Sequence, residues 1–164
     1  MTSTSLHHPH HRVAHRQAAW LSALIPLTVV MVGNGLIFAT GSEGADPAFE
    51  SLELAPPGWL VGLVWVAIYP MWGLARWYAA RSGRAGRRES WWVVALMAWG
   101  LLYPLVTRFD TMPSAWANLA SLALVSVTLW RVWTVSRKGA ALIIPSVGWI
   151  AYATLLGFMA LARA

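Results

Sequence analysis

The chain contains no cysteine, which excludes disulfides, thiolate metal sites and cysteine nucleophiles. Charge is also scarce, because only 11% of the 164 residues are charged whereas 58% are hydrophobic. A soluble domain of this composition would have too little polar surface to cover its apolar residues. No Gly/Ser-rich linker and no internal repeat divides the sequence. The composition therefore predicts one membrane-embedded unit.

Five apolar runs are close to the length that a membrane-spanning helix needs to cross about 30 Å of hydrocarbon. They occupy residues 18–40, 58–79, 91–106, 115–135 and 140–162. They lack the polar–apolar alternation of barrel strands, and a helix satisfies its own backbone hydrogen bonds in lipid. The first run is too long for the core of a cleaved signal peptide. The sequence predicts an all-α bundle of five transmembrane helices over 18–164, preceded by a polar, His-rich tail over 1–17.

The distribution of charge predicts the orientation of this bundle, because short cytoplasmic loops collect Lys and Arg. With a cytoplasmic N-terminus and an external C-terminus, eight basic residues lie inside: Arg12, Arg16, Arg81, Arg84, Arg87, Arg88, Arg137 and Lys138. Only Arg108 and Arg163 lie outside, and the first external loop carries four acidic residues. Arg76 and Arg131 fall near cytoplasmic span ends, where they can snorkel. The net charge of +6 thus reports topology and does not indicate nucleic-acid binding.

Twelve tryptophans fall into two main groups. Seven lie near span ends, where indoles act as interfacial anchors: Trp20, Trp77, Trp91, Trp92, Trp116, Trp130 and Trp133. Four lie deeper, where the indole N–H needs a partner in the protein or in a ligand: Trp65, Trp72, Trp99 and Trp149. The spacing of Trp65, Tyr69 and Trp72 places them on one helix face, which either packs against neighbouring helices or contacts a ligand.

Other polar residues have simple interpretations. His7, His8, His10, His11 and His15 lack a nearby carboxylate or thiolate, so we expect a disordered, weakly metal-binding tail and no metal site. Asn34 in the first span can bond to a ligand or to another helix, and the interhelical bond is the expected role.

The entry to the second span carries a recognisable motif. Pro56-Pro57-Gly58-Trp59 is followed by Gly62, Trp65, Tyr69 and Gly73 at set intervals. This stretch resembles the signature of the translocator protein family, also called tryptophan-rich sensory proteins or TspO/MBR proteins. A second stretch, with Pro145, Trp149, Ala153 and Thr154, is similar to the family's final helix. The number of spans and the tryptophan content agree with both stretches.

Four positions depart from the family's pattern. Gly100 and Tyr103 stand where the third helix of relatives carries Asn and Trp, Ser146 replaces a Tyr, and Gly157 replaces an Asn. The sequence is therefore identified as a divergent member that lacks several polar groups of the family's pocket.

The resemblance implies a pocket that opens toward the long first loop, which acts as a lid over flat apolar ligands such as porphyrins, haem-like tetrapyrroles or sterols. The candidate ligand-binding residues are Trp59, Trp65, Tyr69, Tyr103, Trp149 and Ala153. Trp149 is the first choice among them. The structural motif residues are Pro56, Pro57, Gly62, Gly73 and Pro145, where the prolines suit a helix entry and the glycines suit close helix contact.

Three functions remain open. The first is a binding and regulatory membrane protein for porphyrins, linked to stress or porphyrin handling, with no required cofactor and no catalytic residue. The second is a light-dependent porphyrin-degrading enzyme, although the spans contain no acid/base pair or nucleophile constellation. The third is a transporter, disfavoured by the lack of paired broken helices. The expected partners are the lipid bilayer and a second copy in a homodimer, and the expected location is the bacterial inner membrane.

Overall fold

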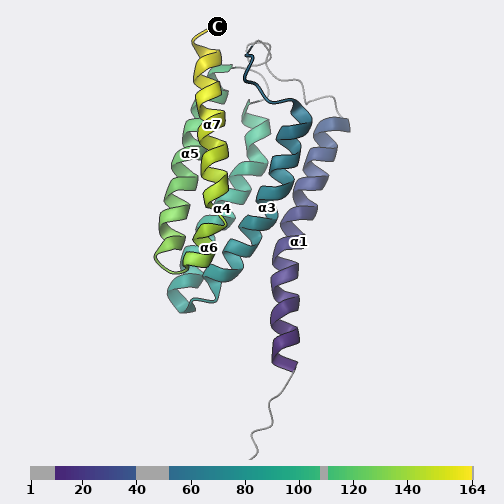
Figure 1. Cartoon of the computed structure of the whole chain (residues 1–164), viewed down its shortest axis with the longest axis vertical. Helices are drawn as coiled ribbons and strands as arrows, with labels where there is room; N and C mark the ends of the chain where they lie inside the picture. Colours follow the sequence, from purple (N-terminus) through teal and green to yellow (C-terminus); the bar gives the residue numbers. More distant parts are fainter. Residues whose placement is uncertain (1–9, 40–51, 108–110, 164) are drawn as a thin grey trace, which may run out of the picture.

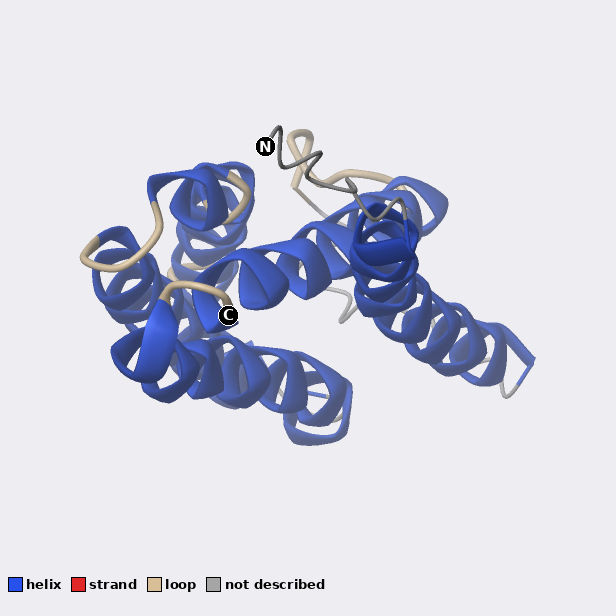
Figure 2. Cartoon of the chain, turned by 90° about the horizontal axis from the view of Figure 1, so that it is seen from below, coloured by secondary structure: helices blue, strands red, loops and turns tan. Residues whose placement is uncertain are grey.

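The computed structural model describes residues 10–39, 52–107 and 111–163, and the described residues are helical apart from short connections (Figure 1). Figure 2 shows the same helices from below, with no strand among the described residues. The elements are α1 (His10–Ala39), α3 (Gly58–Ala80), α4 (Gly83–Thr107), α5 (Thr111–Trp133), α6 (Arg137–Ala141) and α7 (Ile144–Leu161). The predicted all-α bundle with five long helices is confirmed, whereas its orientation in the membrane stays a prediction.

Four described stretches are long and apolar enough to cross a membrane: Ala19–Ile37, Gly58–Ala80, Ser114–Trp133 and Arg137–Leu161. The second predicted span, 58–79, agrees with α3 to within one residue. The fifth predicted span, 140–162, is interrupted in the structure. Leu142 and Ile143 form a turn that separates the short helix α6 from the long helix α7. α6 begins where the Ser136 side chain accepts a hydrogen bond from the Gly139 N–H, a typical N-cap.

The connection between α3 and α4 differs from the sequence prediction. The basic run was expected to be a loop, but Arg84, Arg87 and Arg88 lie in the first turns of α4. Only Arg81 and Ser82 separate the two helices, and the next residue, Gly83, has a φ of 86° that favours glycine. The basic side chains are therefore carried on a helix extending from the third span.

α1 also starts earlier than expected, at His10, and so the polar tail is helical from that residue. Its main neighbour is α3, and it stands at the edge of the bundle beside that helix (Figure 1). Pro26 lacks the N–H that an α-helix would direct to the Ser22 carbonyl, and this carbonyl lies so close to Gly73 that a Cβ there would be 1.9 Å from its oxygen. Asn34 donates to the Gly62 carbonyl at 3.2 Å, as expected for an interhelical polar contact.

The hydrophobic core runs between α3, α4, α5 and the α6–α7 segment. Its most deeply buried members include Trp72 at 1% exposure and Leu96, Val125, Val132 and Ile143 at 1% or less. α6 contacts both α3 and α5, which closes the bundle at the end where α4 begins (Figure 1).

Candidate functional site

The aromatic face of α3 forms as its spacing predicts. The ring centroid of Trp65 lies 6.1 Å from that of Tyr69 and 5.9 Å from that of Trp72. The Tyr69 hydroxyl donates to the Met97 carbonyl at 3.1 Å, and the Trp72 indole N–H donates to Ser146 Oγ at 3.0 Å. These bonds connect one face of α3 to α4 and to α7.

Trp149 lies on α7 and is partly buried against the same core cluster that Trp65 borders. The Trp149 and Tyr152 rings are in contact, with centroids 5.8 Å apart. The Tyr152 hydroxyl donates to the Leu54 carbonyl, and Leu52 packs against the second half of α7. The residues that precede α3 thus contact α7, beginning about one turn after Trp149. Most of the first loop, including the lid assigned to it, lies outside the described residues.

A polar cluster joins α4, α5 and α7. The Tyr103 hydroxyl donates to Asn118 Oδ1 at 2.7 Å, and Asn118 Nδ2 donates to the Ala153 carbonyl at 3.2 Å. The Thr154 hydroxyl in turn contacts the Asn118 carbonyl at 3.2 Å. Asn118 is 4% exposed. Sequence reasoning missed this residue, and the only signal was a strongly polar amide inside an apolar run.

The positions that depart from the family's pattern are packed against polar groups of neighbouring helices. A Cβ on Gly100 would lie 2.7 Å from the Tyr69 hydroxyl oxygen. A Cβ on Gly157 would lie 3.1 Å from Asn118 Nδ2. Ser146 accepts the bond from the Trp72 indole described above and is 1% exposed. The small residues at these three positions leave room that the chain fills with its own side chains.

The six candidate ligand-binding residues fall into separate groups. Trp65 and Tyr69 touch, whereas Trp149 borders the same cluster from α7. Tyr103 and Ala153 share Asn118 as a partner, and Trp59 is 66% exposed in the first turn of α3. A shallow depression elsewhere, on α5, is lined by Ser126, Leu129, Trp130 and Trp133. None of the six residues lines it.

The motif prolines lie at helix entries. Pro57 is the N-cap of α3, and its carbonyl accepts from the Leu60 N–H at 2.9 Å. Pro145 lies in the first turn of α7, where its missing N–H costs no intrahelical bond.

The side chains around Trp149 and Tyr103 that these contacts define are aromatic, amide or hydroxyl groups without formal charge. A ligand there would be held by stacking and hydrogen bonds, not by ion pairing. Among the described residues, no group of three or more His, Cys, Asp or Glu side chains could hold a metal ion.

Long apolar helices with buried polar residues paired across them define a multi-pass integral membrane protein. The model of the TspO/MBR family matches residues 22–162, and the chain belongs to this family, as the resemblance of its motifs predicts. No curated protein and no solved structure matches the chain.

Proposed function

We propose that this membrane protein binds porphyrin or a similarly flat, apolar ligand and that it acts through binding, not through catalysis. The observation that carries the proposal is the pair of partly buried indoles, Trp65 on α3 and Trp149 on α7, which border one hydrophobic cluster from two helices. Family membership supports the same function at the level of a membrane-embedded binding protein.

The chemistry of the site suits a ligand with a large π face. Indole and phenol rings offer area for stacking, and apolar pockets with a few placed polar groups are typical of small-molecule sites. The propionate groups of a tetrapyrrole need donors or water, and the uncharged interior offers no cation to pair with them. We therefore place these groups toward water at the end of the bundle that carries the exposed Trp59.

Catalysis is less well supported. Two carboxylates belong to the described residues, Glu53 before α3 and Glu89 in α4, and Glu89 is paired with Arg131 at the opposite end of the bundle. Neither is part of the aromatic groups around Trp65 or Trp149. The described residues near these indoles thus offer no carboxylate that could act as a general acid or base.

We also propose the bacterial inner membrane as the location and a homodimer as the assembly. Gly33 and Gly35 support the second part, because a Cβ on either would meet nothing within 4 Å in this chain. Each glycine lies on an open part of the α1 surface, where a small residue allows the close approach of a second helix.

The decisive experiment compares Trp149→Ala with Trp133→Ala, since each removes one indole. Loss of an aromatic stacking partner costs about 1–3 kcal/mol in nucleic-acid systems, so by analogy the Trp149 variant should bind protoporphyrin IX about 5- to 150-fold more weakly. Trp133, 48% exposed near the end of α5, should change affinity little. Fluorescence-quenching titrations of equally folded proteins provide the measurement.

Equal affinities in the two variants would remove Trp149 from the site, and the absence of saturable binding by the unmutated protein would reject the proposal. The same titration in light tests catalysis. A light-dependent loss of the Soret band into a new product that requires Trp149 would favour the enzyme over the binding protein.

A further inference from the structure

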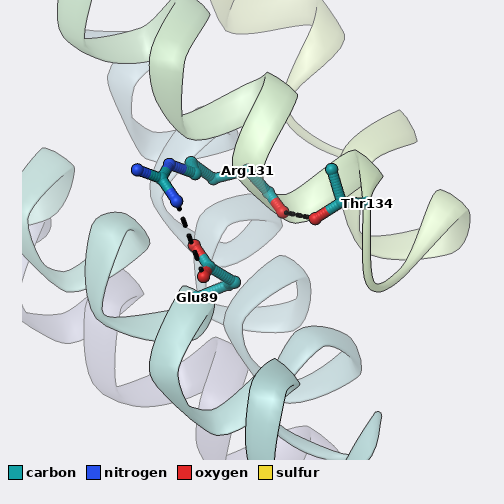
Figure 3. A network of polar contacts seen from close by, with 3 residues as sticks. All are labelled: Glu89, Arg131 and Thr134. Atoms are coloured by element: carbon teal, nitrogen blue, oxygen red, sulfur yellow. Dashed lines mark hydrogen bonds and ion pairs between the residues drawn. The ribbon is translucent and has the colours of Figure 1, made fainter.

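The end of the bundle where α4 begins is strongly basic. From α3 to α6, eight residues at this end are Lys or Arg: Arg76, Arg81, Arg84, Arg87, Arg88, Arg131, Arg137 and Lys138. Glu89 is the one acidic residue described at this end, and Glu89 Oε1 lies 3.8 Å from Arg131 Nη1 (Figure 3). The excess of positive charge attracts anionic lipid headgroups in the adjacent leaflet.

Arg81 lies over one ring, with its guanidinium carbon 4.6 Å from the centroid of Trp77, whereas Arg131 lies between two rings on different helices. Its guanidinium carbon lies 5.5 Å from the ring centroid of Trp92 on α4 and 5.4 Å from that of Trp130 on α5. Such cation–π contacts hold a guanidinium in one orientation. Arg131 is therefore a preorganised cation between two helices.

Glu89 pairs with only some of the N–H donors of the Arg131 guanidinium. The guanidinium has five N–H donors, and one carboxylate oxygen at 3.8 Å occupies one side of it. In Figure 3 a second terminal nitrogen of Arg131 points away from Glu89. The Arg131 side chain is 40% exposed, so an anion at the membrane surface can reach it.

The depression on α5 adjoins this cation. Ser126, Leu129, Trp130 and Trp133 line it and share one face of the helix through their i, i+3, i+4, i+7 spacing. Trp130 thus contacts the Arg131 guanidinium and also forms one wall of the depression. It is 62% exposed, so this wall faces the surroundings of the bundle.

We propose that Arg131 and the α5 depression together bind one anionic phospholipid. Its phosphate accepts hydrogen bonds from the guanidinium, and one acyl chain lies against Leu129, Trp130 and Trp133. The occupant follows from charge complementarity: a headgroup with net negative charge pairs with this basic end, and a zwitterionic headgroup does not gain the same attraction. The site is separate from the aromatic residues around Trp149.

Native mass spectrometry of the purified protein with added phosphatidylglycerol or phosphatidylcholine tests the proposal. The variant Glu89→Gln/Arg131→Gln keeps the net charge of the chain, replacing Glu89 with its isosteric amide and Arg131 with a shorter, neutral amide. We expect it to bind phosphatidylglycerol about tenfold more weakly and phosphatidylcholine unchanged. Arg84→Gln, the control, lowers the net charge by one at an exposed position of the same end and should change phosphatidylglycerol binding by less than about twofold.

A second variant leaves the ion pair intact. Ser126→Phe fills part of the depression from an exposed position and should weaken phosphatidylglycerol binding about fivefold. If the paired glutamine variant does not fold, this variant decides the question. Unchanged binding in the folded variants, or an equal loss in Arg84→Gln, would show diffuse attraction to a basic surface and overturn the proposal.

Discussion

The interior and peripheral tryptophans differ in what satisfies the indole N–H. Inside the bundle, Trp72 donates to Ser146 at 3.0 Å and Trp99 donates to Ser121 at 2.6 Å. Each serine in turn donates to a carbonyl of its own helix, at 2.6 Å for Ser146 and 2.7 Å for Ser121. Each serine hydroxyl thus accepts a hydrogen bond from an indole on another helix and donates one within its own segment.

At the periphery, six indoles are between 48% and 68% exposed: Trp20, Trp59, Trp91, Trp116, Trp130 and Trp133. At the membrane surface, water and headgroups satisfy an exposed N–H, so no serine is needed. A high tryptophan content alone therefore does not indicate a ligand site. Among the four deep indoles, Trp72 and Trp99 are already satisfied by the protein, which leaves Trp65 and Trp149 as the ones to test with a ligand.

The largest expected effect is an all-or-none difference in chemical labelling between the two ends of the bundle, where the peripheral indoles lie. Because the chain has no cysteine, a single Arg84→Cys or Glu53→Cys substitution gives one labelling site. With the basic end in the cytoplasm, a membrane-impermeant maleimide should label Glu53→Cys in intact cells and Arg84→Cys only after the membrane is opened. The reverse pattern would invert the bundle and move the Arg131 site to the external leaflet.

The next effect is on stability. Trp72→Ala removes a side chain that is 1% exposed and leaves Ser146 without its indole donor, so we expect a loss of about 3–5 kcal/mol in the free energy of unfolding. Trp91→Ala, at 66% exposure, should stay within about 0.5 kcal/mol. Reversible denaturation in mixed micelles measures both. Equal losses would contradict the division between interior and periphery.

A smaller loss of stability than that of Trp72→Ala is expected where α3 contacts α1, and none on the outer face of α1. Gly73→Ala places a Cβ 1.9 Å from the Ser22 carbonyl oxygen, so α1 must shift and the unfolding free energy should fall by about 1–3 kcal/mol. Gly33→Ala meets nothing within 4 Å and should not lower the unfolding free energy of the monomer, because Ala favours a helix over Gly. The same denaturation assay applies. If Gly73→Ala is as stable as Gly33→Ala, the close contact between α1 and α3 is not required.

The smallest effect tests the hydrogen bond alone. Trp99→Phe retains an aromatic ring but loses the donor to Ser121, which still donates to the Ala117 carbonyl. We expect a loss of about 1 kcal/mol. Trp116→Phe makes the same chemical change at an indole that is 56% exposed and should have a smaller effect. Equal stability losses in the two variants would contradict a stabilising hydrogen bond from Trp99 to Ser121.

Periodicity and local motifs predicted much of this molecule. The apolar runs predicted the long helices, and the Pro56–Pro57 entry predicted the start of α3 at Gly58. The spacing of Trp65, Tyr69 and Trp72 predicted their mutual contact, because residues on one helix face meet whatever the rest of the fold does.

Features that depend on a second helix were not predictable. The run from Arg84 to Arg88 was assigned to a loop because its charge reports topology, but charge does not prevent a helix from extending beyond the membrane. Asn118 was missed because nothing local indicates which helix its amide faces. The packing of Gly157 against Asn118 likewise requires α5 and α7 to be brought together in space.

The order of contacts along the chain has a consequence for biogenesis. α1 contacts α3, α3 contacts α4, α4 contacts α5 and α5 contacts α7, so each helix leaving the ribosome finds its partner already made. Among the described helices, the α1–α3 pair is the first that can form during translation. The contact of α6 with α3, reinforced by the bond from Trp72 to Ser146, forms only once the last segment has been synthesised. Ser146 follows Trp72 by 74 residues, so this indole acquires its acceptor only after the start of α7 has been made.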